Sequence, residues 1–271
     1  MDRLTRARVL KGQLRYLGRK GAAELLPSRG SGAVDVPADS LDDVLSSYED
    51  DVAFVHVGLS AVNSGFEGNP YEFLRDTLTD HFESILATGY TPAFRDSGVY
   101  HKEFSMPEFG TFSRLFLADA DYRTDDAIHS LLVEGDYRFD DADHHDSFGP
   151  DSCRSTLEDD DVLCLNVGTD RFVCLALHYL EGTTDLPYVE YPEHEGVIYY
   201  DETDYDHVTQ RNYAYTRLLS WNNRKIRRRL EREGVVTDHS RGGLRVHAYR
   251  FGDVTRTLRP VLADDPYYLV T

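Results

Sequence analysis

Short apolar runs alternate along the chain with stretches in which apolar residues recur every three or four positions. The run VAFVHVGL, residues 52–59, is rich in β-branched and aromatic residues and contains Gly58, which predicts a buried strand leading into a loop. Asn69 and Pro70 then open the segment 71–86, whose apolar residues have helical spacing. The first recognisable pattern is therefore strand, loop and helix.

The same alternation continues towards the C-terminus. It predicts a strand at 89–94, a short helix near 109–117, a buried strand at 162–168, a helix at 172–182 closed by Gly182, strands at 197–200 and 244–251, and a largely helical segment at 205–233. Alternating strands and helices indicate an α/β fold with a mixed β-sheet flanked by helices. No repeat or linker divides the chain, so we expect a single domain over residues 1–271, with its motifs between about 50 and 185 and a C-terminal portion at about 186–271.

Composition narrows the class of protein. The 271 residues carry a formal charge of −19 and are 41% hydrophobic, which is enough apolar material for a core and excludes wholesale disorder. No uncharged apolar run is long enough to span a membrane. The first 25 residues scatter their basic residues and lack the apolar centre of a secretory signal. We therefore expect a cytoplasmic protein whose mature chain starts at Met1.

The kinds of charged residue are as unusual as their number. The chain has 25 Arg but 4 Lys, and 32 Asp but 16 Glu. Asp carries its hydrated carboxylate on a short stem, whereas Lys exposes a long apolar one, so this composition gives a surface that holds water. Because molar salt shortens the Debye length to about 3 Å, such a charge is tolerable in a salt-rich cell. We hypothesise a halophilic source. The free energy of unfolding should then rise between roughly 0.1 M and 3 M KCl, and a flat or falling curve would contradict this.

Three cysteines, Cys153, Cys164 and Cys174, are an odd number, and the last two lie in apolar segments. Buried free thiols are the favoured interpretation over a disulfide or a metal site.

The segment LHYLE places His178 and Glu181 three residues apart on the predicted helix after the 162–168 strand. Residues at this spacing share one helix face. A histidine whose tautomer and charge are set by a carboxylate is a common general base near neutral pH, although the same pair also occurs on ordinary helices.

Two further clusters contain groups capable of chemistry. The segment 123–135 brings Asp126, His129 and Ser130 together, which permits a nucleophilic serine beside a base but lacks the small-residue elbow of hydrolases. The segment 140–150, DDADHHDSFGP, is rich in metal-capable side chains without a second ligand pair at a defined spacing. A solvated acidic loop is the simpler interpretation, and we predict no metal site.

Taken in order, seven short blocks resemble the aminoglycoside 3-N-acetyltransferase family. They are VHVGLSAVNSGFEG (55–68), TPAF (91–94), MPEFGTFSRLF (106–116), RTDDAIHSLLVEG (123–135), HDSFGPDS (145–152), VLCLNVG (162–168) and LHYLE (177–181). Each block is short, but their common order and similar spacings cover about residues 50–185.

The resemblance implies an acetyl-coenzyme A-dependent N-acetyltransferase that acts on a primary amine of an amino sugar or aminoglycoside-like small molecule. It implies an α/β fold with a mixed sheet. The expected catalytic residues are His178 as general base, Glu181 as the carboxylate that orients it, His129 and Ser130. The expected coenzyme contacts are Gly58, Leu59, Ser60, Asn166 and Gly168 on the two strand-end loops, with Arg123 for the phosphates.

Several positions depart from the family pattern. Asp126 and Ala127 replace a His and a Pro, Gly58 replaces a Ser, and Asn166 stands where a Gly is usual. These changes leave open an alternative, a catalytically altered family member that binds a ligand or partner. A metal-dependent hydrolase built on the His and Asp clusters is a third possibility.

Charge is also unevenly distributed. Residues 117–161 hold fifteen acids and three Arg, which suits a cationic amine, whereas Arg211 to Arg232 holds eight basic residues and Glu231 as its one acid. The stretch 224–229 could hold coenzyme phosphates, or form an amphipathic helix whose basic face pairs with the acidic surface. A nucleic acid partner is disfavoured, because the total charge of −19 repels a polyanion at ordinary salt.

Overall fold

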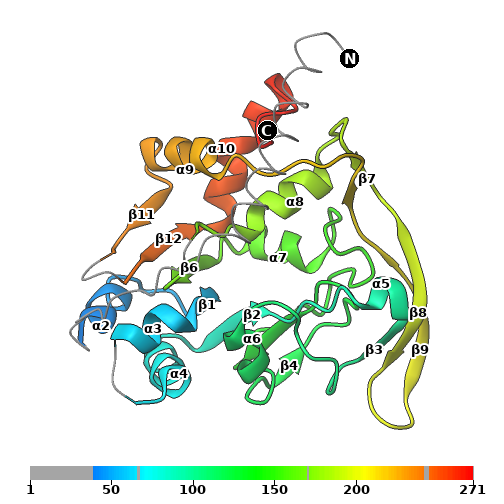
Figure 1. Cartoon of the computed structure of the whole chain (residues 1–271), viewed down its shortest axis with the longest axis horizontal. Coiled ribbons are helices and arrows are strands. Elements are labelled where there is room, and N and C mark those ends of the chain that lie inside the picture. Colours follow the sequence, from blue (N-terminus) through cyan, green and yellow to red (C-terminus); the bar gives the residue numbers. More distant parts are fainter. Residues whose placement is uncertain (1–38, 66–67, 170, 241–243, 271) are drawn as a thin grey trace, which may run out of the picture.

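A mixed seven-stranded sheet forms the centre of the protein in the computed structural model (Figure 1), which describes residues 39–65, 68–169, 171–240 and 244–270. The strand order is β11-β12-β6-β1-β2-β5-β4. The strands are β1 (Val52–Val57), β2 (Ser84–Thr88), β4 (Tyr122–Arg123), β5 (Leu131–Glu134), β6 (Leu163–Val167), β11 (Val236–Asp238) and β12 (Val246–Arg250). The predicted α/β fold with a mixed sheet is confirmed.

The centre of this sheet is parallel and its edges are antiparallel. Strand β1 pairs in parallel with β2 and β6, whereas β12 runs antiparallel to β6 and β5 antiparallel to β2. The carboxyl ends of β1 and β6 therefore lie side by side, and the register pairs Val57 with Val167. Adjacent carboxyl ends of parallel strands are the usual place for a ligand in an α/β sheet.

Helices cover both faces of the sheet (Figure 1). One face carries α7 (Cys153–Asp159), α8 (Leu175–Thr183), α9 (Asn223–Arg232) and α10 (Phe251–Asp264); the other carries α2 (Asp39–Leu45), α3 (Leu59–Gly65), α4 (Pro70–His81) and α6 (Thr111–Phe116). Alternate residues of β1 point to opposite cores, since Phe54 packs with the first set and Ala53 and Val55 with the second. The central strands are thus buried on both sides.

Two small sheets lie outside the main one. Strands β3 (Val99–His101), β8 (Glu193–Tyr199) and β9 (Tyr205–Arg211) form one, next to α5 (Phe94–Ser97), and β7 (Val189–Glu190) pairs with β10 (Ala214–Tyr215) in the other. The β8 and β9 strands form a long hairpin beside the main body of the protein (Figure 1).

The predicted helix at 71–86 is correct over its first part only. Asn69 caps α4 by accepting the amide of Tyr71 at 3.0 Å, and the helix ends at His81. The residues that follow, from Ser84, form β2, and the predicted strand at 89–94 is wrong. Ile85, Leu86 and Ala87 are all buried because both faces of β2 are covered, and such a continuous apolar run resembles the end of a helix.

Two more predictions need correction. Residues 205–211 form strand β9, not a helix, and most of its residues are exposed, so no apolar alternation marks it in the sequence. Gly182 does not close α8, which continues to Thr183. A Cβ at Gly182 would stand 2.4 Å from the carbonyl oxygen of Phe148, so this glycine allows close packing of the loop that carries Phe148.

The basic segment 1–23 lies outside the described residues. In the part of the chain that the structure describes, no helix is both long and apolar enough to cross a membrane.

Candidate active site

His178 lies in the first half of α8, where its ring packs against two aromatic residues. The ring centroids of Trp221 and Phe148 are 4.4 Å and 5.4 Å from that of His178. Burial lowers the pKa of His178 to about 3, with smaller contributions from the positive charges of Arg154 and His56. The imidazole is therefore neutral at physiological pH and has a lone pair to offer.

Glu181 is fully buried one turn further along α8 and accepts four hydrogen bonds. Its Oε2 accepts from the hydroxyls of Tyr213 and Tyr215, at 3.0 Å and 2.7 Å, and from Nε1 of Trp221 at 3.0 Å, while Oε1 accepts from Tyr188 at 3.1 Å. Burial raises the pKa of Glu181 to about 7, although the four donors act in the opposite direction. This carboxyl therefore titrates near neutral pH.

The hydroxyl of Tyr213 stands between these two residues. It forms a short hydrogen bond with Nδ1 of His178, and among the hydrogen bonds of the described residues none joins His178 directly to Glu181. Because the single hydroxyl proton of Tyr213 is donated to Glu181, Nδ1 of His178 must carry a proton and donate it to the tyrosine oxygen. This tautomer leaves the lone pair of His178 on Nε2.

Replacing Tyr213 with Phe removes this link and leaves the ring in place. If Glu181 acts on His178 through the hydroxyl, kcat should fall by about 10-fold to 100-fold with little change in KM. In the wild type, kcat should rise as the pH passes about 7, where Glu181 ionises, and this rise should be absent in the variant. A pH–rate series on the wild type and Tyr213→Phe measures both. An unchanged pH profile in the variant would show that the hydroxyl is only structural.

Two further histidines, both partly buried, have charges that interact with that of His178. His56, near the end of β1, has its pKa lowered to about 4 by burial, and burial followed by Arg154, Arg95 and His178 lowers the pKa of His129. Nε2 of His56 and Nδ1 of His129 have no hydrogen-bond partner among the described residues, and neither does the hydroxyl of Tyr90. Buried polar atoms without partners are expected where a ligand completes the hydrogen bonding.

Phe148 packs between these groups. Its ring lies 4.7 Å from His129 and 5.2 Å from Tyr213, in addition to its contact with His178. The ring of Tyr90 also contacts His129, with ring centroids 4.8 Å apart. The structure thus brings His129 and His178 into contact with the same phenyl ring.

Asp126 and Arg154 form a fully buried ion pair behind this group. Nη1 of Arg154 donates to Oδ2 of Asp126 at 3.1 Å, and Nη2 makes a short hydrogen bond to the carbonyl oxygen of His129. Oδ1 of Asp126 accepts the amide of His129 at 2.7 Å. The pair therefore fixes the backbone that carries His129.

Ser130 and Arg123 are engaged within the protein. The Ser130 hydroxyl donates to the carbonyl oxygen of Gly89 at 2.6 Å and accepts from Nε of Arg123 at 3.1 Å. Arg123 also donates to the carbonyl oxygens of Lys102, Ser105 and Gly89, and its exposed fraction is 5%. In this arrangement both side chains hold loops together, and neither is directed to a substrate or a phosphate.

The expected coenzyme residues lie at the adjoining ends of β1 and β6. The Gly58 amide donates to the carbonyl oxygen of Val167 at 2.8 Å, and a Cβ at Gly58 would stand 2.2 Å from the carbonyl oxygen of Gly168. Gly168 itself has a φ of 66°, which favours glycine. Two glycines are therefore required for the backbones to approach this closely.

Asn166 shapes the second of these loops. Its side chain is buried and bonds both the amide and the carbonyl of Val173, at 2.8 Å and 2.9 Å, just before α8 begins. Leu59 is buried and Ser60 is exposed at the start of α3, so the expected loop after β1 is a helix. Asn166 thus positions the approach to His178.

The structure also places the His and Asp clusters and the three cysteines. Within the described ranges, no three His, Cys, Asp or Glu side chains gather in a way that could hold a metal ion. Cys153, Cys164 and Cys174 are free and buried, as predicted.

Sequence reasoning missed Tyr213, Trp221 and Arg154 as members of this site. Phe148 lies in the recognised block HDSFGPDS and Arg154 lies two residues after it. The sequence of that block does not show which of its side chains point towards His178. Tyr213 and Trp221 follow the β9 strand and reach α8 only in the folded chain, more than thirty residues away in sequence.

The neutral imidazole of His178, hydrogen-bonded to Tyr213, lies on the helix that follows β6, near the carboxyl ends of the parallel strands, where α/β proteins usually bind their ligands. A family model described as aminoglycoside 3-N-acetyltransferase matches residues 54–263, and the chain belongs to that family. It is therefore an N-acetyltransferase that uses acetyl-coenzyme A.

Several solved structures share this fold. The aminoglycoside acetyltransferase AAC(3)-Xa has a TM-score of 0.68 at 17% identity, covering 85% of this chain and 93% of its own. The AAC-IIIb enzyme in its binary complex with CoASH also scores 0.68, at 15% identity, covering 84% and 94%. YokD from Bacillus subtilis scores 0.67 at 11% identity, covering 87% and 96%. A search of curated proteins found no match.

Proposed function

We propose that this protein transfers the acetyl group of acetyl-coenzyme A to a primary amine of an aminoglycoside or a related amino sugar, with His178 as general base. The observation that carries this proposal is the chain of hydrogen bonds from Nδ1 of His178 through Tyr213 to Glu181. A variant of the structural relative AAC(3)-IVa was solved in complex with a gentamicin, at 15% identity and a TM-score of 0.66 over 90% of this chain and 93% of its own, which supports the acceptor class.

The residues present fit a coenzyme. The backbones at Gly58 and Gly168 approach closely without side chains between them, and the unpartnered atoms of His56, Tyr90 and His129 are polar groups that a ligand could satisfy. When bound, the coenzyme supplies an acetyl group activated as a thioester. We assign Gly58, Leu59, Ser60, Asn166 and Gly168 to its binding loops.

The protein's part in the reaction is to hold the amine and move its proton. An ammonium has no lone pair, so the acceptor must be bound as the free amine. As it attacks, Nε2 of His178 takes one amine proton, and the resulting imidazolium is stabilised by the Glu181 carboxylate through Tyr213. A negative charge on Glu181 opposes the effect of burial and raises the pKa of His178.

The proton that His178 takes from the amine is then available for the departing thiolate. Burial keeps His129 neutral by lowering its pKa, so its ring N–H can donate a hydrogen bond but not a whole proton. His178, once protonated, returns its proton to the sulfur and is ready for another cycle. Since the Ser130 hydroxyl already donates to Gly89, the negative charge on the carbonyl oxygen must be met by other donors, and we assign backbone N–H groups near Leu59.

The acidic stretch 117–161 contributes less free charge than its composition suggests. Asp126 pairs with Arg154, Asp146 with Arg211, and Glu158 with Arg259. Attraction of the amine therefore has to come from the acids of this stretch that have no basic partner.

A thiol-release assay tests the proposed function. The protein is incubated with acetyl-coenzyme A and a panel of aminoglycosides and amino sugars, with each amine omitted in turn. Amine-dependent release of free thiol, together with an acetylated product by mass spectrometry, is expected. No release with any amine, although the coenzyme still binds, would favour the catalytically altered family member.

A further inference from the structure

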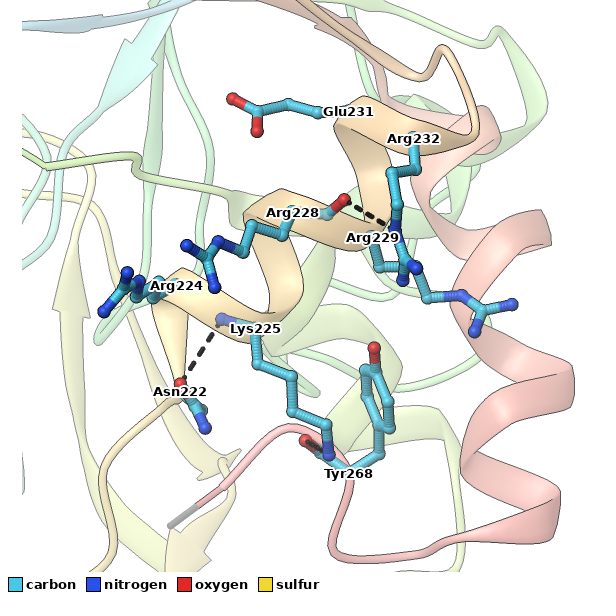
Figure 2. A pocket seen from close by; sticks show the side chains of 8 residues that line it. All are labelled: Asn222, Arg224, Lys225, Arg228, Arg229, Glu231, Arg232 and Tyr268. Carbon is cyan, nitrogen blue, oxygen red and sulfur yellow. Dashed lines mark hydrogen bonds between the residues drawn. The ribbon is translucent and has the colours of Figure 1, made fainter.

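A basic groove lies along α9, apart from the strand ends described above. It has a volume of about 900 Å³ and is lined by Asn222, Arg224, Lys225, Arg228, Arg229, Glu231, Arg232 and Tyr268. Figure 2 shows the cationic side chains projecting from the helix, with Tyr268 on the chain segment that faces it. In a protein of charge −19, this groove is a concentrated positive surface.

Three arginines of the groove have no carboxylate partner among the residues that the structure describes. Arg224, Arg228 and Arg232 are four residues apart, so they form one line along α9 over about 12 Å, and all three are exposed. Within the described part of the chain, no ion pair involves any of them. By contrast, Arg227 on the adjoining face pairs with Glu231 at 2.6 Å and with Asp238 at 3.0 Å.

The remaining lining groups do not cancel this charge. The carboxylate of Glu231 is already bonded to Arg227, and Arg232 donates through Nε to the carbonyl oxygen of Arg228. The ammonium of Lys225 is held by the carbonyl oxygen of Tyr268 at 3.0 Å, over the tyrosine ring. Arg229 pairs with Glu233 at 3.6 Å, so its charge is partly met within the helix. The groove therefore offers the three exposed arginines Arg224, Arg228 and Arg232 as its available cations.

One residue of the groove lining is next in sequence to a residue that contacts His178. Asn222 lines it and directly follows Trp221, whose ring is 4.4 Å from that of His178 and whose Nε1 donates to Glu181. Asn222 also caps α9. One short segment thus connects the basic groove to the proposed base.

We propose that this groove binds the phosphate groups of the coenzyme's nucleotide end. The inference rests on the proposed function and adds the place where the charged end of the donor binds. A diphosphate and a separate ribose phosphate need several cations spread over a bounded site, and arginine binds phosphate oxygens with paired N–H groups. A pantetheine arm extending past Trp221 would then lead to His178. A nucleic acid fits less well, because the acidic surface beyond the groove repels a long polyanion.

The test replaces Arg224, Arg228 and Arg232 together with Gln, and uses Arg256→Gln as the control. Arg256 is an exposed arginine of α10 that pairs with Asp253 and Asp161. Calorimetry on the full chain at about 0.1 M salt, where screening is modest, should show Kd for coenzyme A raised at least about tenfold by the triple variant. Kd for pantetheine, which has no phosphate, should not change in either variant.

S-acetylpantetheine separates this inference from the proposed function. If the triple variant transfers acetyl from S-acetylpantetheine at the wild-type rate but has a higher KM for acetyl-coenzyme A, the groove binds the phosphates. If coenzyme A binds both proteins equally, the groove inference is wrong, whatever the enzyme's activity. Retained binding of single-stranded oligonucleotide by the wild type, lost in the triple variant with coenzyme affinity unchanged, would assign the groove to nucleic acid instead. If neither donor supports transfer by the wild type, the proposed function itself fails.

Discussion

Replacement of His178 with Ala should lower kcat by about 10²-fold to 10⁴-fold, the usual contribution of a positioned general base. The variant keeps α8 and its burial, so coenzyme affinity should change little. Loss of the base should also remove the dependence of the rate on ionisation of Glu181, because no imidazolium remains to be stabilised. Thiol release and calorimetry on the same preparations measure both effects.

A matched control for this variant is His207→Ala. His207 is exposed on β9 and contacts Tyr205 with ring centroids 6.0 Å apart, in the hairpin outside the main sheet. It should retain wild-type kcat. If His178→Ala kept more than about a tenth of the activity, His178 would not be the base, and His129 would be the next candidate.

Replacement of Arg154 with Leu should destabilise the protein by about 3–5 kcal/mol, because it leaves the Asp126 carboxylate buried without its partner. Arg154 and Asp126 are both fully buried, and Arg154 also bonds the backbone of His129 and lies over Phe148 with its guanidinium 5.0 Å from the ring centroid. Urea unfolding at fixed salt measures the loss.

The control for this change is Arg211→Leu, which breaks the partly exposed pair with Asp146 and should cost less than about 1 kcal/mol. The double variant Asp126→Leu with Arg154→Leu should recover part of the loss, since no buried charge remains unpaired. If Arg154→Leu alone were as stable as Arg211→Leu, the Asp126 pair would not hold the backbone of His129.

The parts of the fold that could be predicted from sequence are those with strong local patterns. The strand through Val55 and the buried strand through Leu165 are continuous apolar runs, and α4 starts at a recognisable Asn69-Pro70 cap. These elements place the adjoining glycine loops. Strand β9 could not be predicted because it packs in a small outer sheet with one face in solvent. Strand β2 was predicted as the end of α4 because it is buried on both faces and so has a continuous apolar sequence.

The site was predictable only as far as its residues share one helix or one motif. His178 and Glu181 were found from their spacing, but a helical spacing cannot show that a third side chain stands between them. Tyr213 does so, from a segment that follows the β8 and β9 hairpin, and it is tertiary packing that brings it to α8. The structural role of Arg123 could not be predicted either, because its guanidinium donates to three loop carbonyl oxygens that are distant in sequence.

A crystal structure with coenzyme A and an aminoglycoside bound tests the active site most directly. We predict that the sulfur and the acceptor amine both lie within about 4 Å of Nε2 of His178, a separation close to that of reacting atoms. Tyr213 should still bridge Nδ1 of His178 and Glu181. A coenzyme whose sulfur lies away from His178, or an amine that approaches His129 instead, would contradict the assignment of His178 as the base.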